Sequence, residues 1–157
     1  MSEHRAKIIW EGPGPEFLRG RYSREHHWSF DGGVTVGASA SPAAVPAPFS
    51  NPALVDPEEA FVASIASCHM LTFLHLASRD GFQIDGYEDE AVGVMTPGEN
   101  GVPWVSAVTL RPRIRYGGSV RPSPADEERL HHRAHEGCFI ANSVRTEITV
   151  RGAGSAT

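Results

Sequence analysis

The stretch "DPEEAFVASIASCHMLTFLHLASRDG", residues 56–81, decides the fold. Asp56 followed by Pro57 predicts the start of a helix, because aspartate caps free backbone N–H groups and proline fits the first helical position. Glu59 is spaced to close a capping box with Asp56. The helix should run to the Arg-Asp pair before Gly81 and stop at that glycine. Its expected length is about 35 Å, at about 1.5 Å per residue.

This predicted helix carries no charge over most of its length. From Ala60 to Ser78 it contains no Asp, Glu, Lys or Arg. A helix without a charged face is expected to be buried on most sides. Its serines, threonine, histidines and cysteine make it too polar for a membrane span, so no membrane partner is expected. One sheet in a chain of this length covers part of such a helix, and a second subunit is expected to cover the rest.

Composition narrows the function classes. The chain has 157 residues, and we expect one domain, residues 1–157, with a real hydrophobic core. A net charge of -5 with 40% hydrophobic residues argues against disorder and against a nucleic-acid surface. The N-terminal "MSEHRAKIIWEG" lacks the apolar segment of a secretory signal, which predicts a cytoplasmic protein. In a reducing compartment, two cysteines are more often reactive, metal-binding or buried than permanently bridged.

The remaining segments predict an α+β fold. Alternating apolar residues indicate strands before and after the long helix, with a turn at Asp31-Gly32-Gly33 and a proline-rich loop before the helix. A second helix should begin at Ser123 as its N-cap and end with Gly137 as its C′ residue. Pro112 should lie at a sheet edge or a bulge. The predicted β segments are 6–10, 19–30, 34–40, 82–95, 106–116 and 143–152, and residues 153–157 should form a frayed tail.

Cys68 is the candidate nucleophile. It lies about three turns into its helix, beyond the reach of the helix dipole, which fades within the first turn. A thiol among apolar neighbours is inert, so a reactive Cys68 needs a cation from elsewhere in the fold. Arg19, Arg21 and Arg24 offer one. Glu58 precedes Cys68 by about 15 Å of helix, and a long arginine paired with Glu58 could bridge that distance.

Several motifs together carry a family resemblance. "DPEEAFVASIASC" resembles the "NPEELLAAALAGC" helix of the OsmC/Ohr superfamily, which comprises osmotically inducible protein C and the organic hydroperoxide resistance proteins. "AHEGCFIANS" resembles the second cysteine motif of that superfamily, written AH..CP.S, with Phe139 in place of its usual proline. The likeness covers nearly the whole chain. The segment "SREHHWSFDGG" looks like one OsmC-like branch within the superfamily.

The resemblance implies a fold, an assembly and a reaction. The fold would be OsmC-like, with antiparallel sheets wrapped around two long central helices in an intertwined homodimer. The protein would be a thiol-dependent peroxidase without a cofactor, with Cys68 as the peroxidatic and Cys138 as the resolving cysteine. Glu58 would pair with the active-site arginine, and Arg24 is favoured because it lies within the recognisable "YSREHHW" segment.

The implied reaction begins when Cys68 attacks the O–O bond of an organic hydroperoxide. The resulting sulfenic acid condenses with Cys138 to an intramolecular disulfide, and a dithiol reductant of the lipoyl type restores both thiols.

Two alternatives stay open at this point. The same scaffold could serve as a redox sensor without turnover or as a small-molecule binding protein. A metal site is the other alternative, because His131 and His135 are four residues apart and Cys138 follows three later. No fourth ligand has diagnostic spacing, and imidazoles near a helix C-terminus also fit the carbonyl end. His69 points about 100° away from Cys68 and is expected to pack at an interface.

Overall fold

The structure is a computed structural model that describes residues 1–152. The predicted frayed tail, residues 153–157, lies outside the described residues. The described chain divides into two compact units, one from Met1 to Ala60 and one from Phe61 onward. The expectation of one domain stays a prediction.

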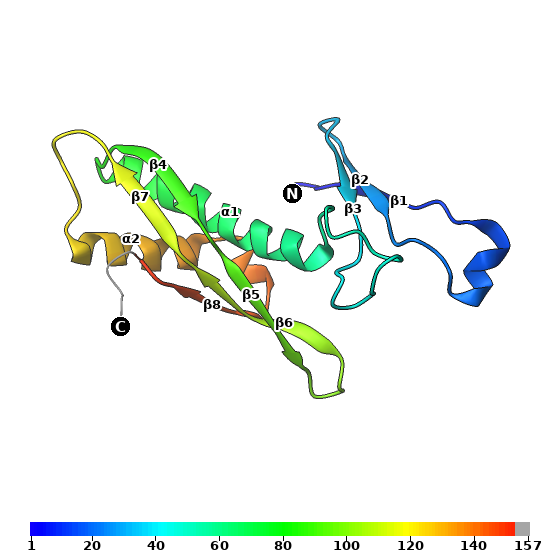
Figure 1. Ribbon diagram of the computed structural model, residues 1–157. Coiled ribbons are helices and arrows are strands. Elements are labelled where there is room, and N and C mark those ends of the chain that lie inside the picture. Colours follow the sequence, from blue (N-terminus) through cyan, green and yellow to red (C-terminus); the bar gives the residue numbers. More distant parts are fainter. Residues whose placement is uncertain (153–157) are drawn as a thin grey trace. The chain divides into compact units, whose positions relative to one another are not determined.

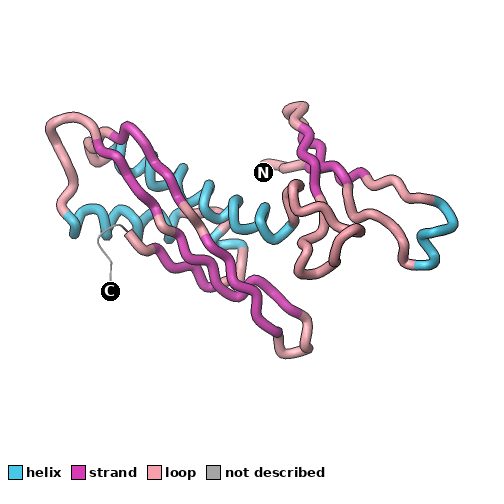
Figure 2. The backbone as a smooth tube through the Cα atoms, viewed as in Figure 1, coloured by secondary structure: helices cyan, strands magenta, loops and turns pink. Residues whose placement is uncertain are grey.

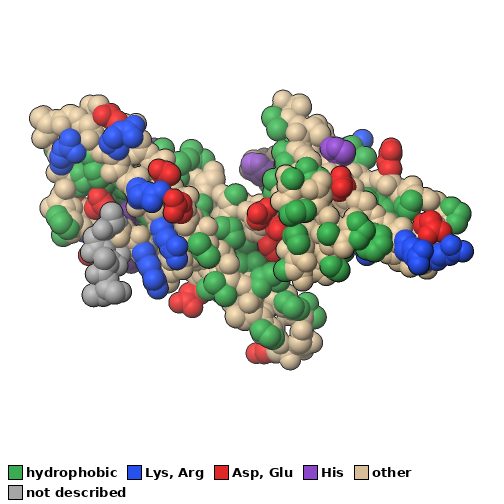
Figure 3. Space-filling model, viewed as in Figure 1, with side chains coloured by type: hydrophobic (Ala, Val, Ile, Leu, Met, Phe, Trp, Pro, Cys, Tyr) green, Lys and Arg blue, Asp and Glu red, His purple; other side chains and the backbone are tan. Residues whose placement is uncertain are grey.

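The first unit contains a three-stranded antiparallel sheet in the order β1-β2-β3 (Figure 1). The strands are β1 (Ala6–Ile9), β2 (His26–Phe30) and β3 (Thr35–Ala38). The predicted turn between β2 and β3 is confirmed, and Gly33 adopts a φ of +86° there. Residues with a Cβ atom rarely adopt that left-handed conformation, which explains why a glycine occupies this position. Hydrophobic side chains are frequent on the visible surface of this unit (Figure 3).

The strand prediction for residues 19–25 was wrong. The chain instead forms a short 3-10 helix, η1 (Gly14–Arg19), and then irregular backbone up to β2. The physical reason is a cluster of three rings, in which Phe17 and Tyr22 lie 4.8 Å apart and both pack against Trp10. These ring contacts within the segment stabilise a compact local structure, so the segment does not pair with a strand.

The long helix α1 (Pro57–Arg79) begins and ends as predicted. Its capping box is confirmed, because Asp56 Oδ1 accepts the Glu59 N–H at 2.8 Å and Glu59 Oε2 accepts the Asp56 N–H at 3.1 Å. After its end, Gly81 has a φ of +85°, and the Gly81 N–H donates to the carbonyl of Ser78. The sequence signals at both ends therefore act locally, independent of what covers the helix.

Between its two helices, the second unit holds four strands where two were predicted. They are β4 (Ile84–Asp89), β5 (Val92–Pro97), β6 (Pro103–Leu110) and β7 (Pro112–Tyr116). Each predicted strand breaks in the middle, so that β4 pairs with β7 in one sheet and β5 pairs with β6 in another. The break coincides with Pro112, which has no N–H to donate, and the N–H of Arg111 is bound by Asp89 Oδ1 at 2.7 Å. Pro112 lies in a two-stranded sheet, and the predicted edge position is confirmed.

The last strand corrects the expectation of purely antiparallel sheets. β8 (Glu147–Val150) runs parallel to β6, and the order in this sheet is β5-β6-β8. Between them the chain passes through β7, the helix α2 (Pro124–Gly137) and the short 3-10 helix η2 (Ala141–Ser143). Such a crossover returns the chain in its original direction, which a tight hairpin cannot do.

The start of α2 is as predicted, and its end differs. Ser123 is the N-cap and forms a capping box with Asp126. Gly137 was predicted as a left-handed C′ residue, which is wrong, because it is the last residue of α2 and its φ is not positive. A Cβ at Gly137 would lie 3.2 Å from Cγ2 of Thr72, so the glycine lets α2 approach α1 closely. Cys138 lies just beyond the helix, as predicted.

One stripe of α1 is buried within the second unit. Ile65 packs against Val108 and Leu110 of β6, whereas Phe73 and Ala77 pack against α2. In Figure 2 the strands of this unit, drawn in magenta, run across the two cyan helices. The outer face of the β4–β7 sheet carries charged side chains, visible as blue and red groups in Figure 3.

The opposite stripe of α1 is exposed and free of charge, and it includes Ser64, Ser67, Leu71 and His75. By length and composition alone, α1 could cross a membrane, but the core helix of a soluble protein has the same properties. Its packing against β6 and α2 favours a core helix.

Candidate functional site

The fold brings the two cysteines together. Cys68 is partly exposed in the middle of α1, and Cys138 follows the last residue of α2 and is 1% exposed. The two thiols lie close enough to interact, and both are free. Two residues that are 70 positions apart in the sequence are therefore neighbours in the second unit.

Backbone N–H groups point at both sulfurs. The Ile140 N–H donates to Cys68 Sγ with an N···S distance of 3.5 Å, and the Ala141 N–H donates to Cys138 Sγ at 3.4 Å. Both donors come from the turn that leads from Cys138 into η2. Such donors stabilise negative charge on sulfur. Sequence reasoning missed them, because main-chain donors of a turn leave no residue signature.

The environment of Cys138 keeps it protonated. Burial raises the pKa of the Cys138 thiol, and its contact with the Cys68 side chain raises it further. The N–H of Ala141 opposes this rise in part. Cys138 therefore stays a neutral thiol at neutral pH and is a poor first nucleophile. Cys68, which is more exposed, is better placed to meet an incoming reagent.

Cys68 lies in the wall of a mainly apolar, open cavity of about 580 Å³. Two large apolar side chains border it, Leu71 at 61% exposed and Phe139 at 83% exposed. Phe139 is the residue that replaces the proline of the resembling motif, and here it forms part of the cavity. The full lining is Ser64, Ser67, Cys68, Leu71, Thr72, His75, Gly137 and Phe139.

The arginine candidates belong to the first unit and differ in their surroundings. Arg24 is half-buried, its Nη1 donates to the carbonyl of Tyr22 at 2.6 Å, and its guanidinium carbon lies 3.7 Å from the centre of the Tyr22 ring. Arg19 is exposed and paired with Glu16 at 2.8 Å. Arg21 is exposed. Local contacts thus orient Arg24 best, and its pairing with Cys68 stays a prediction.

Glu58 occupies the first turn of α1, ten residues before Cys68. At about 1.5 Å per residue this is again about 15 Å along the helix. Glu58 is partly buried, unlike its exposed neighbour Glu59. Its proposed pairing with an arginine stays a prediction.

The histidines are arranged differently from a metal site. His131 turns its Nδ1 toward His69 Nε2 at 3.0 Å, so this nitrogen is engaged by another imidazole. Within residues 1–152, no group of three or more His, Cys, Asp or Glu side chains is arranged to hold a metal ion. His69 was expected to pack at an interface; within the single chain it is 1% exposed between α1 and α2.

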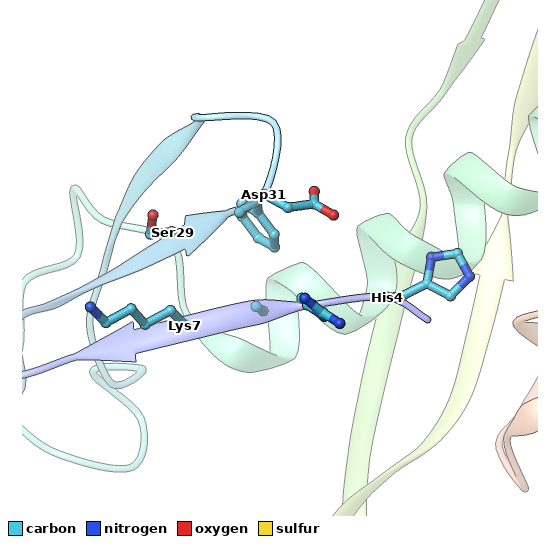
Figure 4. A pocket seen from close by; sticks show the side chains of 7 residues that line it. His4, Lys7, Ser29 and Asp31 are labelled. Atoms are coloured by element: carbon cyan, nitrogen blue, oxygen red, sulfur yellow. The ribbon is translucent and has the colours of Figure 1, made fainter. Parts of the chain in front are cut away.

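A second cavity, of about 590 Å³, lies in the first unit. Figure 4 shows His4 and Lys7 on one side of it and Ser29 and Asp31 on the other. Most of its lining residues are exposed, and Arg5 is paired with Glu3. No cysteine is among its lining residues, and its mixed charges select no ligand of either sign.

Two neighbouring free thiols can form a reversible disulfide. Residues 50–151 match the family model described as OsmC-like protein. The chain is also 47% identical to an OsmC-like protein of unknown function from Vibrio cholerae, with 97% of this chain and 99% of that chain covered and a TM-score of 0.93. The chain therefore belongs to the OsmC-like family.

More distant structures share the fold. An organic hydroperoxide resistance protein from Legionella pneumophila is 17% identical, with 97% of each chain covered and a TM-score of 0.66. The organic hydroperoxide resistance protein of Bacillus subtilis is 22% identical, with 94% of this chain and 96% of that chain covered and a TM-score of 0.61. No curated protein matches the chain. The predicted resemblance and the mixed α+β OsmC-like fold are confirmed.

Proposed function

We propose that this protein is a cytoplasmic, thiol-dependent peroxidase that reduces organic hydroperoxides. The observation that carries the proposal is the proximity of the Cys138 thiol to Cys68, which lies in the wall of an apolar cavity. Two cysteines that touch in a reducing compartment are suited to a reversible disulfide rather than to a structural bridge.

The two thiols have different roles in the reaction, because their environments differ. The Cys68 thiolate attacks the terminal oxygen of R–O–O–H and the O–O bond breaks, so that Cys68–SOH forms. The alkoxide leaves and takes a proton from water to give ROH. The Cys138 thiol then attacks the Cys68 sulfur, and the S–S bond forms as water leaves. A dithiol reductant of the lipoyl type exchanges with this disulfide and returns both thiols. The neutral, buried state of Cys138 supports its role as the second reactant.

The shape and polarity of the cavity support an organic substrate. Leu71 and Phe139 present exposed apolar surface next to Cys68, and burial of such surface favours a substrate with a hydrocarbon group. Hydrogen peroxide gains nothing from these contacts. The preference for organic hydroperoxides should therefore appear mainly as a lower KM.

Arg24 and Glu58 would complete the active site. A planar guanidinium can stabilise the thiolate and orient the peroxide oxygens, and Glu58 would hold the arginine. Arg24 fits this role better than Arg19, whose guanidinium is already paired with Glu16.

Replacing Arg24 tests this assignment. Arg24→Lys should lower kcat/KM for an organic hydroperoxide by about tenfold or more, because lysine keeps the charge and loses the planar fork. The matched control Arg19→Lys should change it less than about twofold. Steady-state peroxide consumption measures both. Equal losses in the two variants would contradict the choice of Arg24.

We propose that the functional form is an intertwined homodimer, in which the α1 helices of two copies form the centre. The charge-free stripe of α1, including Leu71 and His75, is exposed in the single chain and needs a cover. This stripe also lines the cavity at Cys68. A second copy over it would enclose the cavity and exclude water from the thiols.

A comparison of substrates tests the proposed function. With dihydrolipoamide as the reductant, tert-butyl hydroperoxide should be consumed over many turnovers, with kcat/KM about tenfold or more above that for hydrogen peroxide. Mass spectrometry should find one disulfide within one chain after oxidation.

A different outcome would favour the alternative functions. Oxidation of both thiols without turnover under any dithiol would indicate a redox sensor. A chain whose thiols ignore both peroxides would indicate a small-molecule binding protein. The V. cholerae relative of unknown function keeps these alternatives relevant.

A further inference from the structure

A buried pair of histidines joins the two helices that carry the thiols. His69 follows Cys68 on α1, and His131 lies two turns before Cys138 on α2. His69 Nε2 and His131 Nδ1 are 3.0 Å apart, and the rings are nearly parallel, with centroids 5.4 Å apart. The two side chains are 1% and 7% exposed.

Both imidazoles are uncharged at neutral pH. Burial lowers the pKa of each to about 4, and for His69 the proximity of His131 and His135 adds to the effect. The Phe73 ring packs against His131 and also against Tyr87 of β4, which is titratable. One neutral ring therefore donates an N–H to a lone pair of the other, and such a bond is directional and short-ranged.

The other contacts between α1 and α2 are less specific. Phe73 and Ala77 meet Leu130 and Ala134 in an apolar cluster, which sets the spacing of the helices more than their register. The ion pair of Arg133 with Asp80, the residue after α1, has side chains that are 44% and 34% exposed, so solvent screens it. Among residues 1–152, the histidine pair is the buried side-chain hydrogen bond between these two helices.

The pair is also imperfect as a source of stability. His131 Nε2 is buried and has no hydrogen-bond partner within the described chain. An unpartnered buried nitrogen is unfavourable, and two apolar side chains of similar shape would avoid it. Buried polar pairs of this kind can specify one arrangement among several that have similar packing energy.

We propose that His69 and His131 are positioning residues whose hydrogen bond fixes the register of α2 on α1, so that the Cys138 thiol rests against Cys68. A slide of one helical turn, about 5.4 Å, would separate the thiols. The pair thereby sets the rate at which the disulfide closes. This inference rests on the two-thiol function proposed above. The experiment that tests it uses no peroxide.

The test follows disulfide closure with 4,4′-dithiodipyridine. The first cysteine attacks this disulfide, forms a mixed disulfide and releases one thiopyridone. The second cysteine attacks the mixed disulfide, closes the Cys68–Cys138 bond and releases the second thiopyridone. The second phase is intramolecular and independent of reagent concentration, so its rate reports how well the thiols are aligned.

Three variants distinguish register from mere packing. The apolar pair His69→Leu/His131→Leu should fold with wild-type stability or better and close the disulfide about tenfold or more slowly at pH 7. The amide pair His69→Gln/His131→Asn should close it within about threefold of the wild type, because these amides can restore a directional bond. The control His132→Leu, on the exposed face of α2, should leave the second phase unchanged.

Each result decides for or against the proposal. Closure at the wild-type rate in a folded apolar pair would overturn it. A slow amide pair with native circular dichroism would overturn it as well. If the apolar pair fails to fold, the closure rate of the amide pair can be compared with that of the single variant His131→Leu, which tests the same point. Failure of the proposed peroxidase reaction leaves these rates untouched, so the two ideas fail separately.

Discussion

Replacing Cys68 by serine should abolish the consumption of organic hydroperoxides by this protein. Without the sulfur nucleophile the O–O bond is not attacked, and we expect kcat/KM to fall by on the order of 10³-fold or more. The substitution replaces one sulfur atom by oxygen at a partly exposed position and should leave the fold intact. Steady-state peroxide consumption with dihydrolipoamide measures the effect.

Cys138→Ser is the matched control. It should allow one rapid attack that leaves Cys68 as a sulfenic acid, which a dimedone adduct would trap at one equivalent per chain. Turnover with the dithiol should be slowed, because the intramolecular disulfide cannot form. Retention of full peroxide consumption in Cys68→Ser would exclude Cys68 as the peroxidatic residue, and equal single-turnover attack by both variants would remove the division of roles.

Acidification should destabilise the fold strongly through the histidine pair. The folded-state pKa of each imidazole is about 4, below the ordinary value of 6.5. Between these values the unfolded chain binds protons that the folded chain rejects, so the free energy of unfolding falls as the pH falls from about 6.5 to about 4. One imidazole alone accounts for about 3 kcal/mol at the lower end, at about 1.4 kcal/mol per pKa unit. Urea unfolding at successive pH values measures this.

The amide-pair variant His69→Gln/His131→Asn isolates this contribution. Burial raises the pKa of Asp89, which therefore contributes with the opposite sign as the pH falls, and Asp89 is present in both proteins. The difference between wild type and variant should therefore be flat above pH 6.5 and should grow by about 3 kcal/mol or more toward pH 4. A difference that does not change with pH would show that the imidazoles titrate normally in the folded chain.

Local signals in the sequence predicted the helices well. Asp56, Glu59 and Gly81 bracket α1 because capping and left-handed glycine act within a few residues. The strands were predicted less well, because their ends depend on partners far away in the sequence. The break at Pro112 needs the Asp89 side chain from the opposite strand, and the parallel course of β8 depends on the path of a whole crossover.

The two cysteines of the site could be predicted from the sequence, whereas the groups that surround them could not. Cys68 and Cys138 stand in motifs, and their apposition follows from the fold that these motifs indicate. The main-chain donors at Ile140 and Ala141 have no side-chain signature, and the partner of His69 could not be named because helix register is a tertiary property. The histidine spacing in α2 suggested a metal, whereas His131 meets an imidazole.

The turn after α2 has an evolutionary consequence. It supplies the N–H that contacts the Cys68 sulfur, and it also begins with Cys138 itself. Any insertion or deletion in this turn would shift the donors at Ile140 and Ala141 together and would alter both half-reactions of the proposed cycle at once. Selection can therefore tune attack and resolution only in concert through this turn, and independent tuning of either half must come from α1 or from the arginine.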